Sequence, residues 1–309
     1  MDSNVIATEY PRRPVIGILA QDSFNEEEKT EGEQLVYGFI VKFVQMGGAL
    51  VVPVWLGCGD DYYETMMTRI NGLVLPGAYT NDPLNSPYAT TAHKLIRRAM
   101  ELNDAGVYFP IYGVCAGLQT FTAFVTGENL LKECDTYRLR NKLETTSDGD
   151  INSSRLLGSL SNKALNILMN EPAVLHMHYY GVRYQDFVSD SRLTDYFHVY
   201  STNKDRKGET IVSTIEAKDY PFCLMQWHAD KYSFFNSTRI FTPWSPDFIQ
   251  LGSEVALFVA KEAMKNTQCF ASIEEETSLL IENPKNARKV FFPFREIGYY
   301  PSAADGVAV

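Results

Sequence analysis

The chain has 309 residues, of which 45% are hydrophobic and 13% aromatic, and its formal net charge is −10. This composition supplies enough apolar side chains for a sizeable core. The acidic charge argues against sequence-independent binding to nucleic acids, which needs a basic surface, and the absence of any apolar run of about 18 residues argues against a membrane-spanning helix.

The first half of the chain alternates short apolar runs with segments of helical periodicity. We expect strands at residues 15–19, 49–55, 72–75 and 109–112, and helices at residues 34–46, 61–70, 91–102 and 117–124. Strands that are apolar throughout and are separated by helices predict an α/β fold, with a mostly parallel central sheet and helices on both faces. Ligands of such sheets bind beyond the carboxyl ends of the strands.

The second half of the chain is more mixed. We expect a helix at residues 165–169, a hairpin of residues 198–201 and 210–216, a buried strand at 222–227 and an amphipathic helix at 248–264. The length is compatible with two domains, but the chain has no internal repeat and no clear boundary. We therefore predict an N-terminal arm at residues 1–13 and a single domain at residues 14–309, with a C-terminal segment that wraps around it.

The motif G-x-C-x-G occupies residues 113–117, directly after an apolar run. A strand, a sharp turn and a helix in this order hold a nucleophile above the end of a sheet. The N-terminus of the helix favours a thiolate, and such positions lower a cysteine pKa from about 8.5 to roughly 3.5–7.5. The motif predicts that Cys115 is a nucleophile; a buried thiol between two packing glycines is the alternative.

His228 is the histidine that follows a predicted buried strand and precedes an acidic residue, Asp230. A cysteine nucleophile needs a base that takes up its proton and protonates the leaving amine, and a carboxylate can fix the tautomer of that base. We predict that Cys115, His228 and Asp230 form the catalytic group, although a lone histidine at the end of a strand is more often structural.

Two backbone amides are expected to form an oxyanion hole. Ala116 follows the nucleophile and offers one N–H, and the turn at Gly77 and Ala78, at the end of a neighbouring predicted strand, offers the other through Ala78. Gly77 is then expected to line the substrate site. A turn that only ends the strand is the alternative.

His176 and His178 form an H-x-H pair that would share one face of a strand, as metal ligands can. No third ligand with a suitable spacing accompanies them, so we predict no metal site. We expect no cofactor either.

The five cysteines are far apart and include no C-x-x-C pair, which argues against a zinc site and against a dense disulfide scaffold. Their odd number leaves at least one free thiol, for which Cys115 is the natural candidate. A single disulfide among the other four cysteines remains an alternative. The sequence starts without the segments of a secretory signal, which is expected either for a cytosolic protein or for a sequence that begins near a mature N-terminus. The glycosylation acceptors at Asn152 and Asn236 slightly favour the secretory pathway.

Several segments resemble the γ-glutamyl hydrolases, a family of class I glutamine amidotransferase-like proteins with a flavodoxin-like, three-layer fold. They are R-P-V-I-G-I-L at 13–19, I-N-G-L-V-L-P-G at 70–77, Y-F-P-I-Y-G-V-C at 108–115, S-T-N at 201–203, Q-W-H at 226–228 and the helix at 258–265. The likeness extends to about residue 279, and the order and spacing of I-N-G-x-x-x-P-G and Q-W-H are specific. On these segments the chain is identified as a member of that family.

This resemblance implies a cysteine peptidase that cleaves the γ-glutamyl amide bonds of folylpoly-γ-glutamates, which are small-molecule substrates. The family's nucleophile falls on Cys115, its catalytic histidine on His228, and a histidine linked to substrate binding on His178. The family is usually lysosomal, vacuolar or secreted. Dimers are known in it, so a homodimer is a further expectation.

The chain departs from the family pattern at Ala78, where glycine is common, and at Asp230, where glutamate is common. If position 78 has a left-handed conformation, alanine adds strain on the order of 1 kcal/mol. Aspartate is shorter than glutamate, so its contact with His228 is expected to lengthen or be lost. A weakly active member that only binds γ-glutamyl compounds is therefore an alternative, and a glutaminase domain that supplies ammonia to a synthetase is another.

A polyglutamate tail carries many negative charges, so a chain with a net charge of −10 needs a local cationic site or an acidic pH to bind it. His178, Lys231 and Arg155 are the candidate cations. We accordingly expect an acidic pH optimum.

Overall fold

The computed structural model of the chain describes residues 12–22, 34–146, 149–235, 244–283, 287–291 and 296–301. Most of the expected N-terminal arm, residues 1–11, lies outside this set. Arg13 lies inside it, and its guanidinium donates a hydrogen bond to the backbone oxygen of Gly48 at 2.8 Å. Among the described residues, no helix is both long and apolar enough to span a membrane.

A large sheet runs through the molecule in the order β4-β1-β5-β6-β14-β13-β12-β9. Its strands are β1 Val15–Leu19, β4 Leu50–Val54, β5 Gly72–Leu75, β6 Ile111–Val114, β9 Glu144–Thr145, β12 Phe197–Lys204, β13 Thr210–Ala217 and β14 Phe222–Met225. From β4 to β14 all neighbours pair in parallel, and β13, β12 and β9 continue the sheet antiparallel. The predicted α/β fold with a mostly parallel sheet is thus confirmed.

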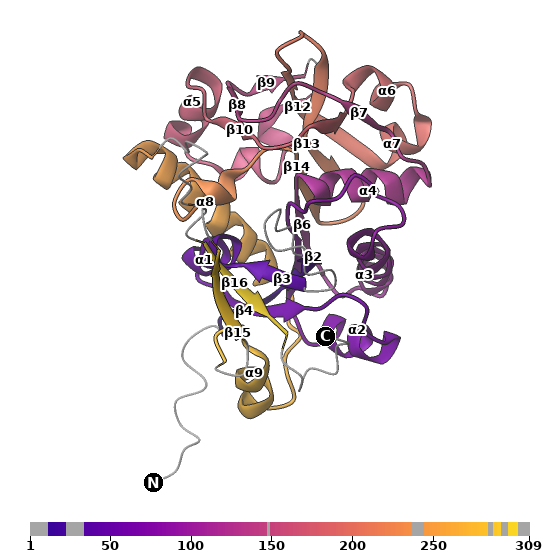
Figure 1. The fold of residues 1–309 in the computed structure, drawn as a ribbon, viewed down its shortest axis with the longest axis vertical. Helices are drawn as coiled ribbons and strands as arrows, with labels where there is room; N and C mark the ends of the chain where they lie inside the picture. Colours follow the sequence, from indigo (N-terminus) through magenta and orange to yellow (C-terminus); the bar gives the residue numbers. More distant parts are fainter. Residues whose placement is uncertain are drawn as a thin grey trace.

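Helices cover both faces of the parallel strands (Figure 1). Helices α1 (Gly38–Met46) and α8 (Pro246–Ala263) pack together on one face, and α2 (Asp60–Met67), α3 (Pro87–Asp104) and α4 (Ala116–Thr126) lie on the other. The two longest helices, α3 and α8, begin in the same way. The side chain of Ser86 or Ser245 accepts a backbone N–H of the first turn, and a proline occupies the first helical position.

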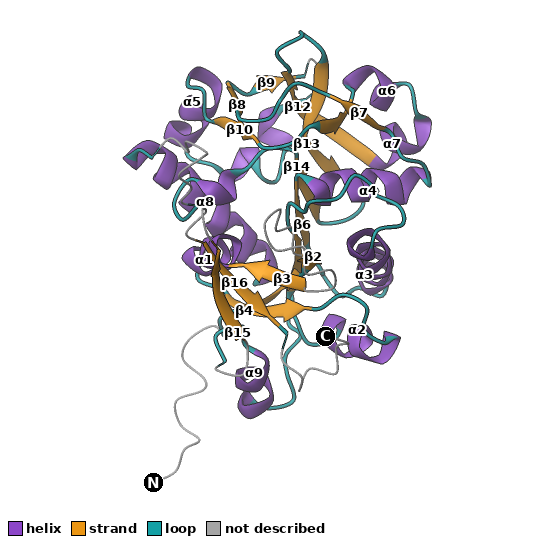
Figure 2. Cartoon of the chain, viewed as in Figure 1, coloured by secondary structure: helices purple, strands orange, loops and turns teal. Residues whose placement is uncertain are grey.

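A second group of short elements lies around the antiparallel strands (Figure 2). β7 (Leu131–Glu133) pairs with β11 (Tyr180–Val182), and β8 (Leu139–Asn141) pairs with β10 (Val174–His176). The remaining elements here are α5 Asn162–Asn170, α6 Tyr184–Val188, α7 Ser191–Tyr196 and the 3-10 turns Ile151–Ser153, Leu157–Ser159 and Ala229–Lys231. The helix predicted at 165–169 and the hairpin of β12 and β13 are confirmed, both longer than expected.

Segments near the two ends of the chain pair with each other. β15 (Ala287–Phe291), β16 (Glu296–Tyr300), β3 (Gln34–Tyr37) and β2 (Gln21–Asp22) form one sheet in that order, with α9 (Ile273–Leu279) preceding β15. In Figure 1 the yellow C-terminal strands lie beside the indigo β3. The prediction of a helix over residues 34–46 was therefore wrong for its first four residues. Their strand conformation depends on partners more than 250 residues away, at Gly298 and Tyr299.

Candidate active site

Three neighbouring parallel strands end at the same place, and each is followed by a predicted site residue. Gly77 follows β5, Cys115 follows β6 and His228 follows β14. A Cβ placed on Gly77 would lie 3.4 Å from the Cβ of Cys115, 3.0 Å from Cε1 of His228 and 3.7 Å from its Nε2. The fold therefore brings the predicted nucleophile and the predicted base together around a position where only a hydrogen fits easily.

Cys115 stands on a strained backbone turn between β6 and α4. Its φ of 54° and ψ of −105° are unusual for a residue with a side chain, and such conformations cost on the order of 1–3 kcal/mol. The turn is held because the Cys115 N–H donates to the backbone oxygen of Met225 at 2.7 Å. At Gly117 an added Cβ would lie 2.3 Å from the backbone oxygen of Leu75, so glycine is needed where α4 crosses β5.

His228 and Asp230 form a buried pair beside this turn. Nδ1 of His228 lies 3.0 Å from Oδ1 of Asp230, and the two residues are 3% and 1% exposed. The shorter aspartate therefore reaches the histidine, against the expectation from its length. With the carboxylate accepting from Nδ1–H, the lone pair of His228 is on Nε2, the nitrogen that lies 3.7 Å from a Cβ placed on Gly77.

Burial dominates the protonation of Cys115 and His228 but not that of Asp230. It raises the pKa of Cys115 to about 12, although the Lys231 ammonium and the Ala116 N–H oppose it. Burial also lowers the pKa of His228 below its usual value, with Asp230 offsetting only part of the effect. For Asp230, burial is outweighed by His228 and Lys231, so its pKa is lowered and it is a carboxylate at neutral pH. In the free protein the predicted pair is thus a thiol and a neutral imidazole.

The turn after β5 is anchored by a residue that no sequence motif indicated. Tyr88, in the first turn of α3, is fully buried and donates its hydroxyl to the backbone oxygen of Pro76 at 2.7 Å. Among the described residues other than glycine, a left-handed φ occurs at Cys115 and Arg138 but not at Ala78. The alanine at position 78 therefore adds no left-handed strain.

A buried polar network supports the strand that leads to His228. The indole N–H of Trp227 donates to the hydroxyl of Thr214 at 3.1 Å, and Ser201 donates to the same hydroxyl at 2.8 Å. The side-chain amide of Gln119, on α4, donates to that of Gln226 at 3.3 Å. The S-T-N and Q-W-H segments thus connect β12, β13, β14 and α4. The strand predicted at 222–227 ends at Met225.

His176 and His178 are buried and bonded to each other. Nδ1 of His176 lies 3.1 Å from Nε2 of His178, and Nδ1 of His178 lies 2.9 Å from the backbone oxygen of Tyr180. Burial lowers the pKa of His178 to about 3, so it carries no charge at ordinary pH. Within the described ranges no group of three or more His, Cys, Asp or Glu residues is arranged to hold a metal ion.

Lys231 and Arg155, the other two candidate cations, already interact with neighbouring groups of the protein. The Lys231 ammonium lies 3.7 Å from the ring centre of Phe39 and 4.4 Å from that of Phe235, and the residue is 7% exposed. Arg155 donates to the backbone oxygens of Ala217 and Tyr220 and lies 3.6 Å from Glu216.

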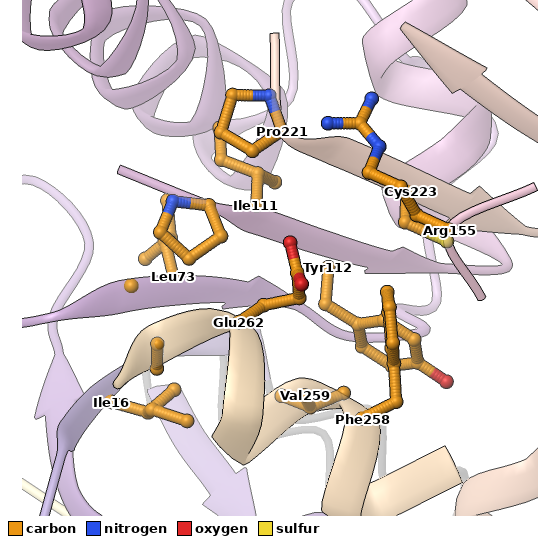
Figure 3. A pocket seen from close by; sticks show the side chains of 13 residues that line it. Ile16, Leu73, Ile111, Tyr112, Arg155, Pro221, Cys223, Phe258, Val259 and Glu262 are labelled. Atoms are coloured by element: carbon orange, nitrogen blue, oxygen red, sulfur yellow. The ribbon is translucent and has the colours of Figure 1, made fainter. Parts of the chain in front are cut away.

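Arg155 also lies at the wrong end of the sheet for the predicted site. It borders a small pocket whose lining includes Leu73, Ile111 and Pro221, at the amino ends of β5, β6 and β14 (Figure 3). Glu262 points into this pocket from α8 (Figure 3). Cys115 and His228 follow the opposite ends of the same strands.

The remaining expectations concern cysteines and glycosylation. All five cysteines are free thiols. Asn152 is exposed in the 3-10 turn Ile151–Ser153, and Asn236 lies outside the described residues.

Comparisons with known proteins match most of the chain. Residues 14–230 match the family Peptidase C26. The chain is 32% identical to the gamma-glutamyl hydrolase of Rattus norvegicus over 87% of its own length and 84% of the relative's, and 32% identical to that of Homo sapiens over the same shares. Among solved structures, PurLQS from Thermotoga maritima is 14% identical, with a TM-score of 0.43, and the match covers 80% of this chain and 99% of that one.

Proposed function

The chain belongs to the Peptidase C26 family, and from this premise we propose that it hydrolyses γ-glutamyl amide bonds through a thioester on Cys115. One observation carries the proposal: Cys115, on its strained turn, and Nε2 of His228 both lie within 4 Å of the same point at Gly77. The gamma-glutamyl hydrolases that match over most of the chain support the same bond specificity.

The reaction begins from a neutral thiol and a neutral imidazole, because burial raises the pKa of Cys115 and lowers that of His228. Sγ of Cys115 attacks the γ-carbonyl carbon while Nε2 of His228 takes the thiol proton. Asp230 stabilises the imidazolium and keeps Nδ1 protonated. The N–H groups of Ala116 and Ala78 stabilise the negative charge that forms on the carbonyl oxygen.

The second half of the reaction releases both products. His228 gives its proton to the nitrogen of the leaving amine, and the C–N bond breaks to leave a thioester on Cys115. Water then attacks the thioester while His228 takes one of its protons, and the thiol is restored when that proton returns to sulfur. The products are an amine and a free γ-carboxylic acid.

For the substrate we propose folylpoly-γ-glutamates, and for the compartment an acidic one. His228 must be neutral to accept the thiol proton. Since burial keeps its pKa below 6.5, its neutral form persists into the acidic range, and activity is lost only as the pH falls through that lowered pKa. The two departures that suggested a weakened member leave the local geometry intact: Asp230 reaches His228 at 3.0 Å, and Ala78 lacks a left-handed φ.

The test is product analysis with folate pentaglutamate between pH of about 4.5 and 7.5, a range that spans the reference histidine pKa of about 6.5. Wild-type protein is expected to shorten the tail, and Cys115→Ala to abolish turnover. Cys269→Ala, at an exposed cysteine, is the matched control and should retain it. Turnover by Cys115→Ala would refute the nucleophile, and turnover of free glutamine without turnover of the polyglutamate would indicate a glutaminase instead.

A further inference from the structure

The turn that follows β5 lies beyond the hydrogen-bonded part of that strand. The pairing of β5 with β6 ends at Leu75 and Gly113. Pro76, the next residue, has no N–H with which to continue the ladder. The turn therefore needs another support if the Ala78 N–H is to keep one direction, as the proposed oxyanion hole requires.

Tyr88 supplies such a support with its side chain. Its hydroxyl donates to the backbone oxygen of Pro76 at 2.7 Å. The oxygen of Pro76 and the N–H of Gly77 belong to one planar peptide unit, so a bond that holds the oxygen also fixes the direction of the N–H. The hydroxyl of Tyr88 thus fixes the peptide from which the chain enters the turn.

Tyr88 is itself held in one place. It is 1% exposed and lies in the first turn of α3. Pro87 occupies the first position of that helix, and the Ser86 side chain accepts the N–H of Ala89 at 3.2 Å. Burial and the charge of Cys115 raise the pKa of the Tyr88 hydroxyl well above its usual value. The hydroxyl therefore stays protonated, and remains a donor, at neutral and acidic pH.

Helix α3 contacts the other half of the proposed oxyanion hole as well. It packs against α4 (Figure 1), and Nε2 of His93 lies 3.2 Å from the backbone oxygen of Thr120, within α4. Helix α4 begins at Ala116, whose N–H is the first proposed donor. One helix therefore supports both the turn that contains Ala78 and the helix that begins at Ala116.

The position of the turn matters because the space around it is small. A Cβ placed on Gly77 would lie 3.0 Å from Cε1 of His228 and 3.4 Å from the Cβ of Cys115. In such a site a misplacement of about 1 Å costs roughly 10²-fold in rate. A displaced turn would change the distance between the proposed oxyanion donor and the carbonyl group that Cys115 attacks.

On the basis of the proposed function, we propose that Tyr88 is a positioning residue for the oxyanion hole. Its hydroxyl holds the Pro76–Gly77 peptide so that the Ala78 N–H points at the carbonyl oxygen of the substrate while that oxygen gains negative charge. Tyr88 acts on the reaction through the backbone of the turn. It stabilises the transition state, in which the oxygen is charged, more than the bound substrate, in which the oxygen is neutral.

The experiment compares Tyr88→Phe with Tyr63→Phe, with folate pentaglutamate as the substrate. Both variants keep the ring and lose a buried hydroxyl that donates to a backbone oxygen. In Tyr63 this acceptor is Trp55, at 3.1 Å, directly after β4. Tyr88→Phe should lower kcat about 10- to 100-fold, less than the 10²–10³ that follows the loss of an oxyanion donor, and leave KM nearly unchanged. Tyr63→Phe should keep both constants, and urea unfolding checks that both variants are folded.

Alkylation by iodoacetamide separates the oxyanion hole from the nucleophile, because the alkylation of a thiol forms no oxyanion. The alkylation rate at Cys115, followed by peptide mass spectrometry, should therefore be the same in Tyr88→Phe and Tyr63→Phe. A rate that falls as far as kcat would show that Tyr88 acts on the thiol and would overturn the proposal. Equal kcat values in the two variants would overturn it as well.

If wild-type protein does not cleave folate pentaglutamate, the proposed function fails, and p-nitrophenyl acetate then tests Tyr88 separately. Sγ of Cys115 takes the acetyl group, nitrophenolate leaves, and the thiol proton passes to His228. Negative charge forms on the acetyl oxygen during this transfer, so the same hole is needed. Slower release of nitrophenolate by Tyr88→Phe than by Tyr63→Phe supports the proposal. Equal release, or release by wild-type protein no faster than by Cys115→Ala, refutes it.

Discussion

Burial and the helix terminus act in opposite directions on the Cys115 thiol. The N-terminus of α4 and the Lys231 ammonium favour the thiolate, but the residue is only 6% exposed and its pKa is raised to about 12. The sequence motif alone suggested a pre-formed thiolate. In the folded protein the thiol is protonated instead, so the proposed mechanism requires His228 to remove its proton during attack.

The first prediction at the residue scale concerns Lys231. Lys231→Met should raise the pKa of Cys115 further, because a buried cation that stabilises the thiolate is lost. The measurement is the rate of iodoacetamide alkylation against pH. Below the pKa this rate falls about tenfold for each unit by which the pKa rises. Lys265→Met, at an exposed lysine on the surface, is the control, and equal alkylation profiles for both variants would contradict the role of Lys231.

The second prediction concerns the carboxylate behind the base. Asp230→Asn keeps the shape of the side chain but can donate to Nδ1 of His228, which favours the wrong tautomer. By analogy with catalytic triads we expect kcat to fall by about 10²–10⁴, with little change in KM. Steady-state kinetics with folate pentaglutamate test this, and a circular dichroism melt checks that the variant is folded. A variant with full kcat would show that Asp230 does not orient the base.

At the scale of elements, the crossing of α4 over β5 sets the position of Cys115. Gly117→Ala would place a methyl group 2.3 Å from the backbone oxygen of Leu75. Since neither backbone can move freely, α4 must shift, and we expect the free energy of unfolding to fall by about 1–3 kcal/mol. The shift displaces the Ala116 N–H as well, so kcat should fall.

Urea unfolding and kinetics measure both effects of Gly117→Ala. Gly59→Ala is the control, because a Cβ there meets nothing within 4 Å and its φ is negative; its effect on stability should be much smaller. Equal losses in the two variants would contradict the argument from close approach.

Buried strands of the large sheet were predicted well, even β6 and β14, which pair across more than 100 residues, whereas the short strand β3 was not. The run at 15–19 and the strand at 72–75 lie in the interior of the sheet and are apolar throughout, so their type follows from composition. Residues 34–37, Gln-Leu-Val-Tyr, continue a helical periodicity into α1. They are a strand because β16 and β2 pair with them, which no local pattern reveals.

At the scale of the whole molecule, the C-terminal strands close the fold onto its N-terminal part. Tyr299 and Tyr300 of β16 are 7% and 5% exposed, and β16 pairs with β3 just before α1. A chain that ends at residue 283 loses this pairing. Burying a large apolar side chain contributes roughly 1.5–3 kcal/mol, so we expect the free energy of unfolding to fall by about 3 kcal/mol or more.

Urea unfolding of that shortened chain tests the prediction, with a chain that ends at residue 301 and keeps both strands as the reference. The shortened chain should also associate more readily, because β3 would present an unpaired edge; size-exclusion chromatography detects this. Equal urea midpoints for the two chains would show that the C-terminal strands do not stabilise the fold.

The sequence by itself determined the class of the fold and the two central residues of the candidate site. Apolar strands alternating with helices specify a parallel sheet, and a cysteine or histidine that directly follows such a strand must lie at its carboxyl end, because these are local properties of the chain. Tertiary structure decided the contact of Asp230 with His228 and the raised pKa of the Cys115 thiol. It also decided the position of Arg155 at the far end of the sheet and the hydrogen bond of Tyr88 with Pro76. Each of these depends on burial or distance, which only the packing of the elements against one another determines.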